Sequence, residues 1–112
     1  MDIDLHGYHP VDINLAALVR QAWEMGAPQI TLIHGHGHNR GISAGFVNSN
    51  TGFFGMTIRP TLRHDPEFKP WIVRTSLDCG HDGSTTIRLR RNPKPTRIDI
   101  DMNLVGEPRF RR

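Results

Sequence analysis

This sequence has almost no cysteine, and it lacks long apolar runs and a leader-like N-terminus. Cys79 is the only cysteine among 112 residues, so no internal disulfide can form, which fits a reducing compartment. No apolar run approaches the length needed to span a membrane. Residues 1–5 lack the basic and apolar regions of a secretory signal peptide. We therefore expect a cytoplasmic protein without a membrane partner rather than a disulfide-rich secreted scaffold.

Basic residues are scarce in the first half of the chain. Only Arg20 and Arg40 precede Arg59, and the others gather later, notably in residues 88–94 and 109–112. The 14 Lys and Arg outnumber the 11 Asp and Glu, which gives a formal net charge of +3. A one-sided cationic surface suits a polyanion such as nucleic acid, although a solvated face and a free tail produce the same pattern.

Histidine, in contrast, is abundant and unevenly placed. Six of the seven histidines fall in three short segments that also contain glycine, and only His64 stands apart. Imidazole titrates near neutral pH, so such a cluster indicates proton transfer, metal binding or contact with phosphate. The six clustered residues are His6, His9, His34, His36, His38 and His81.

Periodicity in the first third predicts a βαβ unit. Residues 3–6 alternate apolar and polar side chains, as a short strand does. Apolar residues then recur at helical spacing from Val11 to Ala22, with Pro10 suited to the first helical position and Gly26 to the end. The β-rich run of residues 29–33 predicts the next strand.

The remainder is less regular. We interpret residues 42–55 as a long loop, because turn-forming residues recur there. A helix over about residues 57–64 follows, with Pro60 tolerable only in its first turn. Residues 71–77 and 85–90 predict two strands joined by a turn at 80–83, and alternation in residues 97–104 suggests an extra strand.

These elements predict one α/β domain of order βαβαββ over residues 1–92, with residues 93–112 as a C-terminal extension that ends in a basic tail. Ligands of parallel sheets gather beyond the carboxyl ends of the strands. His6-Gly7 and His34-Gly35 each follow a predicted strand at that edge. Two segments that are distant in sequence should therefore converge.

Asp4 and His6 form the first candidate pair. The two-residue period of a strand puts both side chains on one side, where a carboxylate can set the tautomer of an imidazole. A surface salt bridge made by Asp4 is the simpler alternative.

Residues 34–41 form the second and strongest candidate, with three histidines and three glycines in eight positions. Glycines let backbone amides approach a phosphate closely, and imidazoles can donate to its oxygens or transfer protons. Packing gives little reason for such a composition. The third segment, residues 80–85 with His81, is explained better by a plain hairpin when taken alone.

Residues 5–7, 33–37 and 80–89, in that order, resemble the Smr (small MutS-related) domain. Its pattern is Asp-Leu-His-Gly, a helix, a strand ending in His-Gly-X-Gly or Thr-Gly-X-Gly, and a late Gly-Gly-X-Gly turn before the last strand. The likeness covers about residues 2–91. Two features depart from it, since His81 stands where the family usually has a second glycine and residues 42–55 form an insertion.

The resemblance implies a two-layer mixed sheet with helices on one face, similar to the C-terminal domain of translation initiation factor 3. Members nick or cleave DNA, and others cleave RNA, including messages on stalled ribosomes. The expected partner is therefore DNA or RNA, with ribosome association in some members. The resemblance also implies a site formed by Asp4, His6, His34, Gly35 and Gly37.

An uncovered sheet face would leave room for phosphate contacts. Arg74, Arg88 and Arg90 occupy alternate positions of the predicted strands, and we expect them on the wet face as a cationic track. They would supply affinity and register rather than base recognition.

Phosphodiester cleavage is the leading hypothesis, with no required cofactor or with help from a divalent cation. His6, oriented by Asp4, would be a general base or acid, and His34 its complement. Amides around Gly35 and Gly37, together with Arg40, would stabilise charge on the phosphoryl oxygens. The remaining expected phosphate contacts are Gly7, His36, His38 and His81.

Two alternatives remain. The alternating histidines of residues 34–38 look like a metal-binding run, which would make the chain a zinc metallohydrolase, but only His64 and His81 are left to supply further ligands. A non-catalytic nucleic-acid or ribosome-binding module is the stronger alternative, because a fold by itself does not imply an activity.

Overall fold

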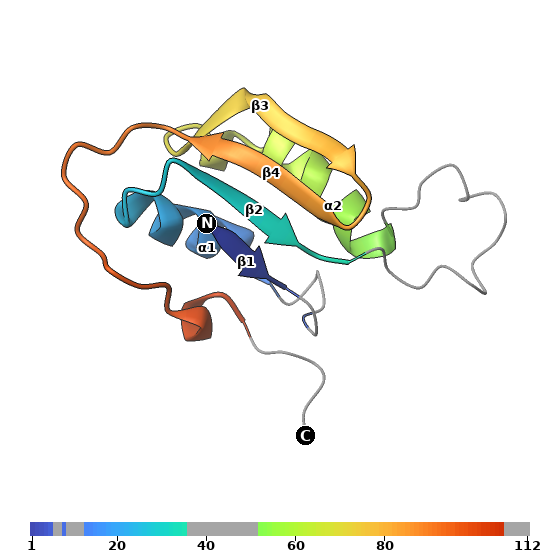
Figure 1. The fold of residues 1–112 in the computed structure, drawn as a ribbon, viewed down its shortest axis with the longest axis horizontal. Helices are drawn as coiled ribbons and strands as arrows, with labels where there is room; N and C mark the ends of the chain where they lie inside the picture. The colour runs from blue at the N-terminus through green and yellow to red at the C-terminus, as the bar shows by residue number, and fades with distance from the viewer. Residues whose placement is uncertain (6–7, 9–12, 36–51, 107–112) are drawn as a thin grey trace, which may run out of the picture.

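The computed structural model describes residues 1–5, 8, 13–35 and 52–106 (Figure 1). Its elements, in chain order, are β1 (Asp2–Asp4), α1 (Leu15–Glu24), β2 (Gln29–Ile33), α2 (Gly52–His64), the 3-10 helix η3 (Pro66–Phe68), β3 (Ile72–His81), β4 (Ser84–Leu89) and the 3-10 helix η4 (Met102–Leu104). None of the helices in these ranges is long and apolar enough to cross a membrane.

The strands form one mixed sheet in the order β1-β2-β4-β3. β1 and β2 are parallel, whereas β4 is antiparallel to both of its neighbours. Figure 1 shows α1 and α2 on the same side of this sheet. The predicted α/β class is therefore confirmed, with a four-stranded sheet and two α-helices.

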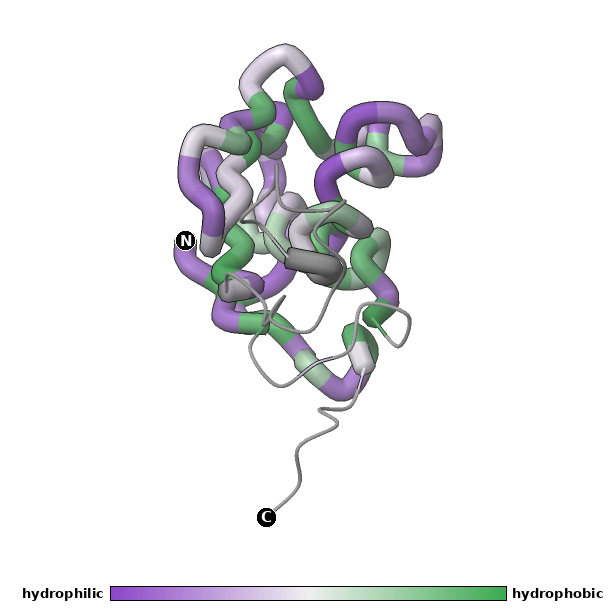
Figure 2. The backbone as a smooth tube through the Cα atoms, turned by 90° about the vertical axis from the view of Figure 1, so that its right-hand side faces the viewer, coloured by the Kyte–Doolittle hydropathy of each residue, from purple (hydrophilic) through white to green (hydrophobic). Residues whose placement is uncertain are grey.

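Register explains why one face of the sheet is covered and the other is open. Ile3 lies opposite Leu32, and Leu32 lies opposite Thr85, so these inward positions align across three strands. Hydrophobic and hydrophilic positions both recur along the coloured part of the backbone in Figure 2. The covered face carries Ile3, Ile30, Leu32, Ile72, Thr85, Ile87 and Leu89, all buried beneath the helices.

The start of α1 differs from the prediction. The helix begins at Leu15, five residues after Pro10, which itself lies outside the described residues. Asn14 sets this start because its side-chain oxygen accepts a hydrogen bond from the N–H of Ala17 at 3.0 Å. The end is as predicted: Gly26 follows the last turn with φ +79°, a conformation that favours glycine.

The helix α2 also differs from the prediction. It begins at Gly52, so residues 52–55 are helical rather than part of a loop, and Pro60 lies well inside the helix. The backbone bond that Pro60 cannot donate would go to the carbonyl of Met56. Both side chains are exposed, so water can take the place of this bond while Ile58 and Leu62 stay buried on the opposite side.

The predicted hairpin of β3 and β4 is confirmed, but its turn is shorter than expected. Gly80 and His81 belong to β3, and only Asp82 and Gly83 form the turn. The pairing of β3 with β4 shifts register between Val73 and Asp78 and again before His81. These irregularities let β3 extend to ten residues beside the six of β4.

The extra strand expected in residues 97–104 is absent, and this prediction was wrong. Residues 93–106 instead run across α1 and contain the short η4. Backbone N–H groups of Thr96 and Arg97 bond to the carbonyl of Glu24, and the side chain of Gln21 exchanges two bonds with the backbone of Asp101. Val105 is 1% exposed, so this segment belongs to the core that α1 and the sheet share.

Candidate functional site at the carboxyl edge of the sheet

The carboxyl ends of β1 and β2 lie side by side. Asp4 is in register with Ile33, and the N–H of Leu5 bonds to the carbonyl of Ile33 at 2.8 Å. His34 is the next residue after Ile33. The structure therefore brings Leu5 and His34 to the edge that the sequence predicted.

Only part of the predicted site can be placed. Asp4, His34, Gly35 and the later residues Arg74, His81, Arg88 and Arg90 are described. The other predicted site residues lie outside the described ranges, and their predicted roles stay predictions. They are His6, Gly7, His36, Gly37, His38 and Arg40.

Asp4 and His34 share an edge but not a face. Asp4 is exposed between two buried neighbours, Ile3 and Leu5, which places its carboxylate on the open face. His34 is only 4% exposed and contacts Thr85, which belongs to the covered face. The structure thus does not bring the Asp4 carboxylate and the His34 imidazole to one point.

Both ring nitrogens of His34 are engaged inside the protein. Nδ1 lies 2.9 Å from the carbonyl of Gly35, and since a carbonyl can only accept, Nδ1 carries a proton. Nε2 lies 2.9 Å from the hydroxyl of Thr85. In the neutral ring Nε2 then accepts from that hydroxyl. His34 can exchange a proton with a phosphate only after one of these bonds opens.

Arg59, which no sequence pattern indicated, completes this cluster from α2. Its Nε donates to the hydroxyl of Thr85 at 2.8 Å, and its Nη2 donates to the carbonyls of Ser84 and His81 at 2.9 and 2.5 Å. The guanidinium of Arg59 therefore joins α2 to the hairpin, and it donates to the same hydroxyl that bonds to His34. We call the half-buried Arg59 together with the buried Thr85 and His34 the relay.

Thr85 offers the one sequence signal that could have revealed the relay. It precedes Ile87 and Leu89 at two-residue spacing, so alternation places a polar side chain on the covered face. A polar group that is 0% exposed requires partners within the protein. Those partners, Arg59 and His34, lie 26 and 51 positions earlier in the chain, and the residue spacing within β4 does not identify them.

Gly35 plays a backbone role in the described structure. Its φ of +76° lies in the region that favours glycine, and its N–H bonds to the carbonyl of Gly83 at 2.9 Å. The amide of His34 bonds to the same carbonyl at 3.1 Å. The hairpin turn therefore holds the end of β2, and the Gly35 amide is already used within the protein.

Arg74 is not on the wet face, which corrects the predicted cationic track. Its guanidinium donates to the carbonyl of Leu62 at 3.2 Å and also bonds to the carbonyl of Asp65. Both carbonyls lie at the C-terminal end of α2, where backbone acceptors lack helical partners and a positive charge is favourable. Arg74 faces the helices because it shares a side of β3 with the buried Ile72, two residues earlier. The sequence did not show this phase, since Val73 on the other side is also apolar.

Arg88 is on the open face as predicted, but far from the histidines. It lies opposite Gln29 and Val73, at the end of the sheet where β2 begins. Arg90 follows β4 at that same end, whereas His81 is exposed opposite Ser84 near the carboxyl edge. Arginines and histidines thus occupy opposite ends of the sheet.

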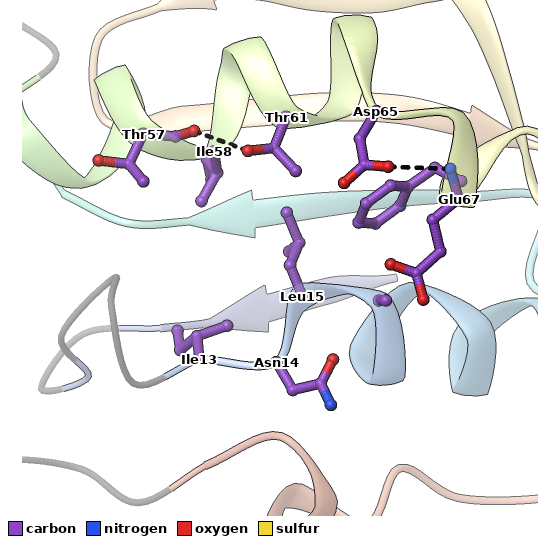
Figure 3. Close-up of a pocket in the computed structure, with 10 residues that line it drawn as sticks. Ile13, Asn14, Leu15, Thr57, Ile58, Thr61, Asp65 and Glu67 are labelled. Carbon is purple, nitrogen blue, oxygen red and sulfur yellow. Dashed lines mark hydrogen bonds between the residues drawn. The ribbon is translucent and has the colours of Figure 1, made fainter.

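A hollow of about 490 Å³ lies between the first turn of α1 and α2. Figure 3 shows Leu15 pointing from α1 toward α2, with Asp65 and Glu67 at one end of the hollow. Thr57 and Thr61 add hydroxyls. Its two carboxylates disfavour a phosphate ligand, so we do not place the candidate site there.

A metal site at this edge would require several ligand side chains close together. Within the described ranges, no three His, Cys, Asp or Glu side chains gather as metal ligands. His36 and His38, on which the metallohydrolase alternative depends, lie outside those ranges.

The sequence and the described structure were also compared with known proteins. No family model, curated protein or solved structure matches the chain. The likeness to the Smr domain therefore rests on the residues of the three motifs.

Proposed function

We propose that this chain binds nucleic acid and cleaves its phosphodiester bonds at the carboxyl edge of β1 and β2. The parallel pairing of these strands is the observation that carries the proposal, because it ends with Asp4 and Ile33 side by side immediately before the two glycine-histidine segments. The motif likeness to Smr domains supplies the reaction class, and a fold like that of the initiation factor 3 C-terminal domain is part of the same proposal.

The geometry favours a division of roles among the histidines. His6, oriented by Asp4 on the open-face side of β1, is the proton-transfer group in this proposal. His34 is a positioning residue, since its bonds to Thr85 and Gly35 fix the start of the segment that follows. The complementary proton-transfer group then falls within residues 36–40, which also include the phosphate contact Arg40.

Cleavage assays on matched RNA and DNA substrates, with and without a chelator, test this proposal. His6→Ala should lower the cleavage rate by about 10²- to 10⁴-fold while nucleic-acid affinity stays close to that of the parent. His64→Ala is the matched control, because this exposed histidine at the end of α2 is outside the proposed site. Equal cleavage by the His6→Ala protein would reject the assignment.

A non-catalytic nucleic-acid-binding module is the second candidate. The burial of His34 and the engagement of both its nitrogens favour this reading, because they remove one expected acid-base group from the edge. Salt-sensitive binding without cleavage of any single-stranded, duplex or branched substrate is its expected signature. The same set of assays therefore separates the two candidates.

A further inference from the structure

A second hollow, at the other end of the sheet, carries a concentration of positive charge. It lies where β4 ends and β2 begins and has a volume of about 460 Å³. Arg88, Arg90 and Arg91 all line it, together with Val73 and Asn92, and none of its lining residues is acidic. We call this hollow the arginine pocket.

The three guanidinium groups differ in how firmly they are held. Arg90 is held at both ends. Its backbone N–H bonds to the carbonyl of Trp71, and the Nε of its guanidinium donates to the carbonyl of Lys69 at 2.9 Å. The side chains of Arg88 and Arg91 are exposed and have no hydrogen bond or ion pair with any residue that the structure describes. Two of the three charges are therefore available to a ligand.

Stabilisation of the nearby end of α1 does not explain these arginines. The last four carbonyls of that helix already accept hydrogen bonds. Those of Gln21, Ala22 and Trp23 accept from the backbone N–H groups of Met25, Ala27 and Gly26, and Trp23 also accepts from the side chain of Asn92. The carbonyl of Glu24 accepts from the N–H groups of Thr96 and Arg97.

The acidic side chain at the end of α1 is also occupied. The carboxylate of Glu24 is paired with Arg20 and Arg97, each at 3.1 Å. Three like charges around one hollow repel one another, and no described carboxylate lines the hollow to offset this. An anionic ligand is the partner that would relieve this repulsion.

We propose that the arginine pocket binds a phosphate group of nucleic acid, an inference that rests on the proposed function. Guanidinium forms two parallel hydrogen bonds with phosphate oxygens, which suits it to this ligand better than lysine. Gln29, opposite Arg88, and His34 are five residues apart along β2, or about 17 Å at the rise of a strand. A chain that contacts both ends of the sheet then spans about five nucleotides at 3.4 Å each.

The test uses the full chain and a labelled oligonucleotide several times longer than this span, in RNA and DNA forms. Arg88→Gln with Arg91→Gln should weaken binding about 10-fold or more and lower the slope of log affinity against log salt by about 1 per arginine. Arg63→Gln, an exposed arginine of α2, is the control for lost charge. Arg90 is left unchanged because of its bond to Lys69, and thermal unfolding verifies that each variant is folded.

The outcomes distinguish the pocket from the proposed function. Affinity and salt slope in the double variant equal to those of Arg63→Gln would overturn the pocket and leave the proposed function standing. Failure of the parent to bind any oligonucleotide would overturn both. If inorganic phosphate alone then binds by calorimetry, and does so through Arg88 and Arg91, the ligand is a free phosphate and the nucleic-acid assignment fails.

Discussion

The hydroxyl of Thr85 lies 2.9 Å from Nε2 of His34, and both residues are buried. The same hydroxyl accepts from Arg59, so one threonine oxygen connects an imidazole, a guanidinium and two strands. When the His34 ring is neutral, the hydroxyl donates its proton to Nε2 and accepts from Arg59, so each group has a partner. The relay therefore connects the carboxyl edge of the sheet to α2 through directional hydrogen bonds, which apolar packing does not provide.

Replacing Thr85 by Val is expected to destabilise the fold. The change preserves side-chain shape but leaves Nε2 of a neutral His34 without its donor and Nε of Arg59 without its acceptor. The free energy of unfolding should fall by about 1–3 kcal/mol, measured by denaturant titration. Thr86→Val is the matched control, because Thr86 is only half-buried on the open face and shares its hydroxyl with Thr31. Equal losses in the two variants would contradict the relay.

Arg74 and Arg88 should behave in opposite ways. Arg74→Met removes the bonds to the end of α2 but keeps most of the apolar stem, so stability should fall by about 1.5–3 kcal/mol. Nucleic-acid affinity and its salt slope should not change, since Arg74 faces the helices. Chemical unfolding and anisotropy titrations measure the two effects. A drop of about one in the salt slope would restore Arg74 to the phosphate-binding surface.

The segment of residues 93–106 should contribute to stability through Val105. Val105→Ala removes two methyl groups from a buried position whose carbonyl also accepts from the N–H of Asn14 at 2.7 Å. A loss of about 2 kcal/mol in unfolding free energy is expected. Ile98→Ala, at a side chain that is 94% exposed, should change it by less than about 0.5 kcal/mol. Similar values for both variants would mean that this segment is not part of the core.

The sequence predicted best where local pattern and burial coincide. Residues 29–33 are a short apolar run between turn signals, and β2 has those bounds. The hairpin was visible because two β-rich runs flank a glycine-containing turn. In residues 97–104 the pattern misled, since Ile98 and Leu104 alternate with polar residues yet are both exposed. Their segment makes backbone hydrogen bonds to α1, and an alternating sequence pattern gives no sign of such contacts.

The site was less predictable than the fold. The meeting of two strand ends followed from the topology of a parallel pair. The face occupied by each side chain did not, because the register with β4 places His34 against Thr85 and away from Asp4. Arg59 was hidden for the same reason: its partners in the hairpin are brought to it only by tertiary packing.

The sheet also ends in two strands that are poorly suited to recruit another chain. β1 offers only three residues along its outer edge, and the ten residues of β3 change register twice. A neighbouring molecule seeking to continue the sheet would find too few aligned backbone groups at either border. Both borders of the sheet therefore disfavour edge-to-edge aggregation, even where the local protein concentration is high.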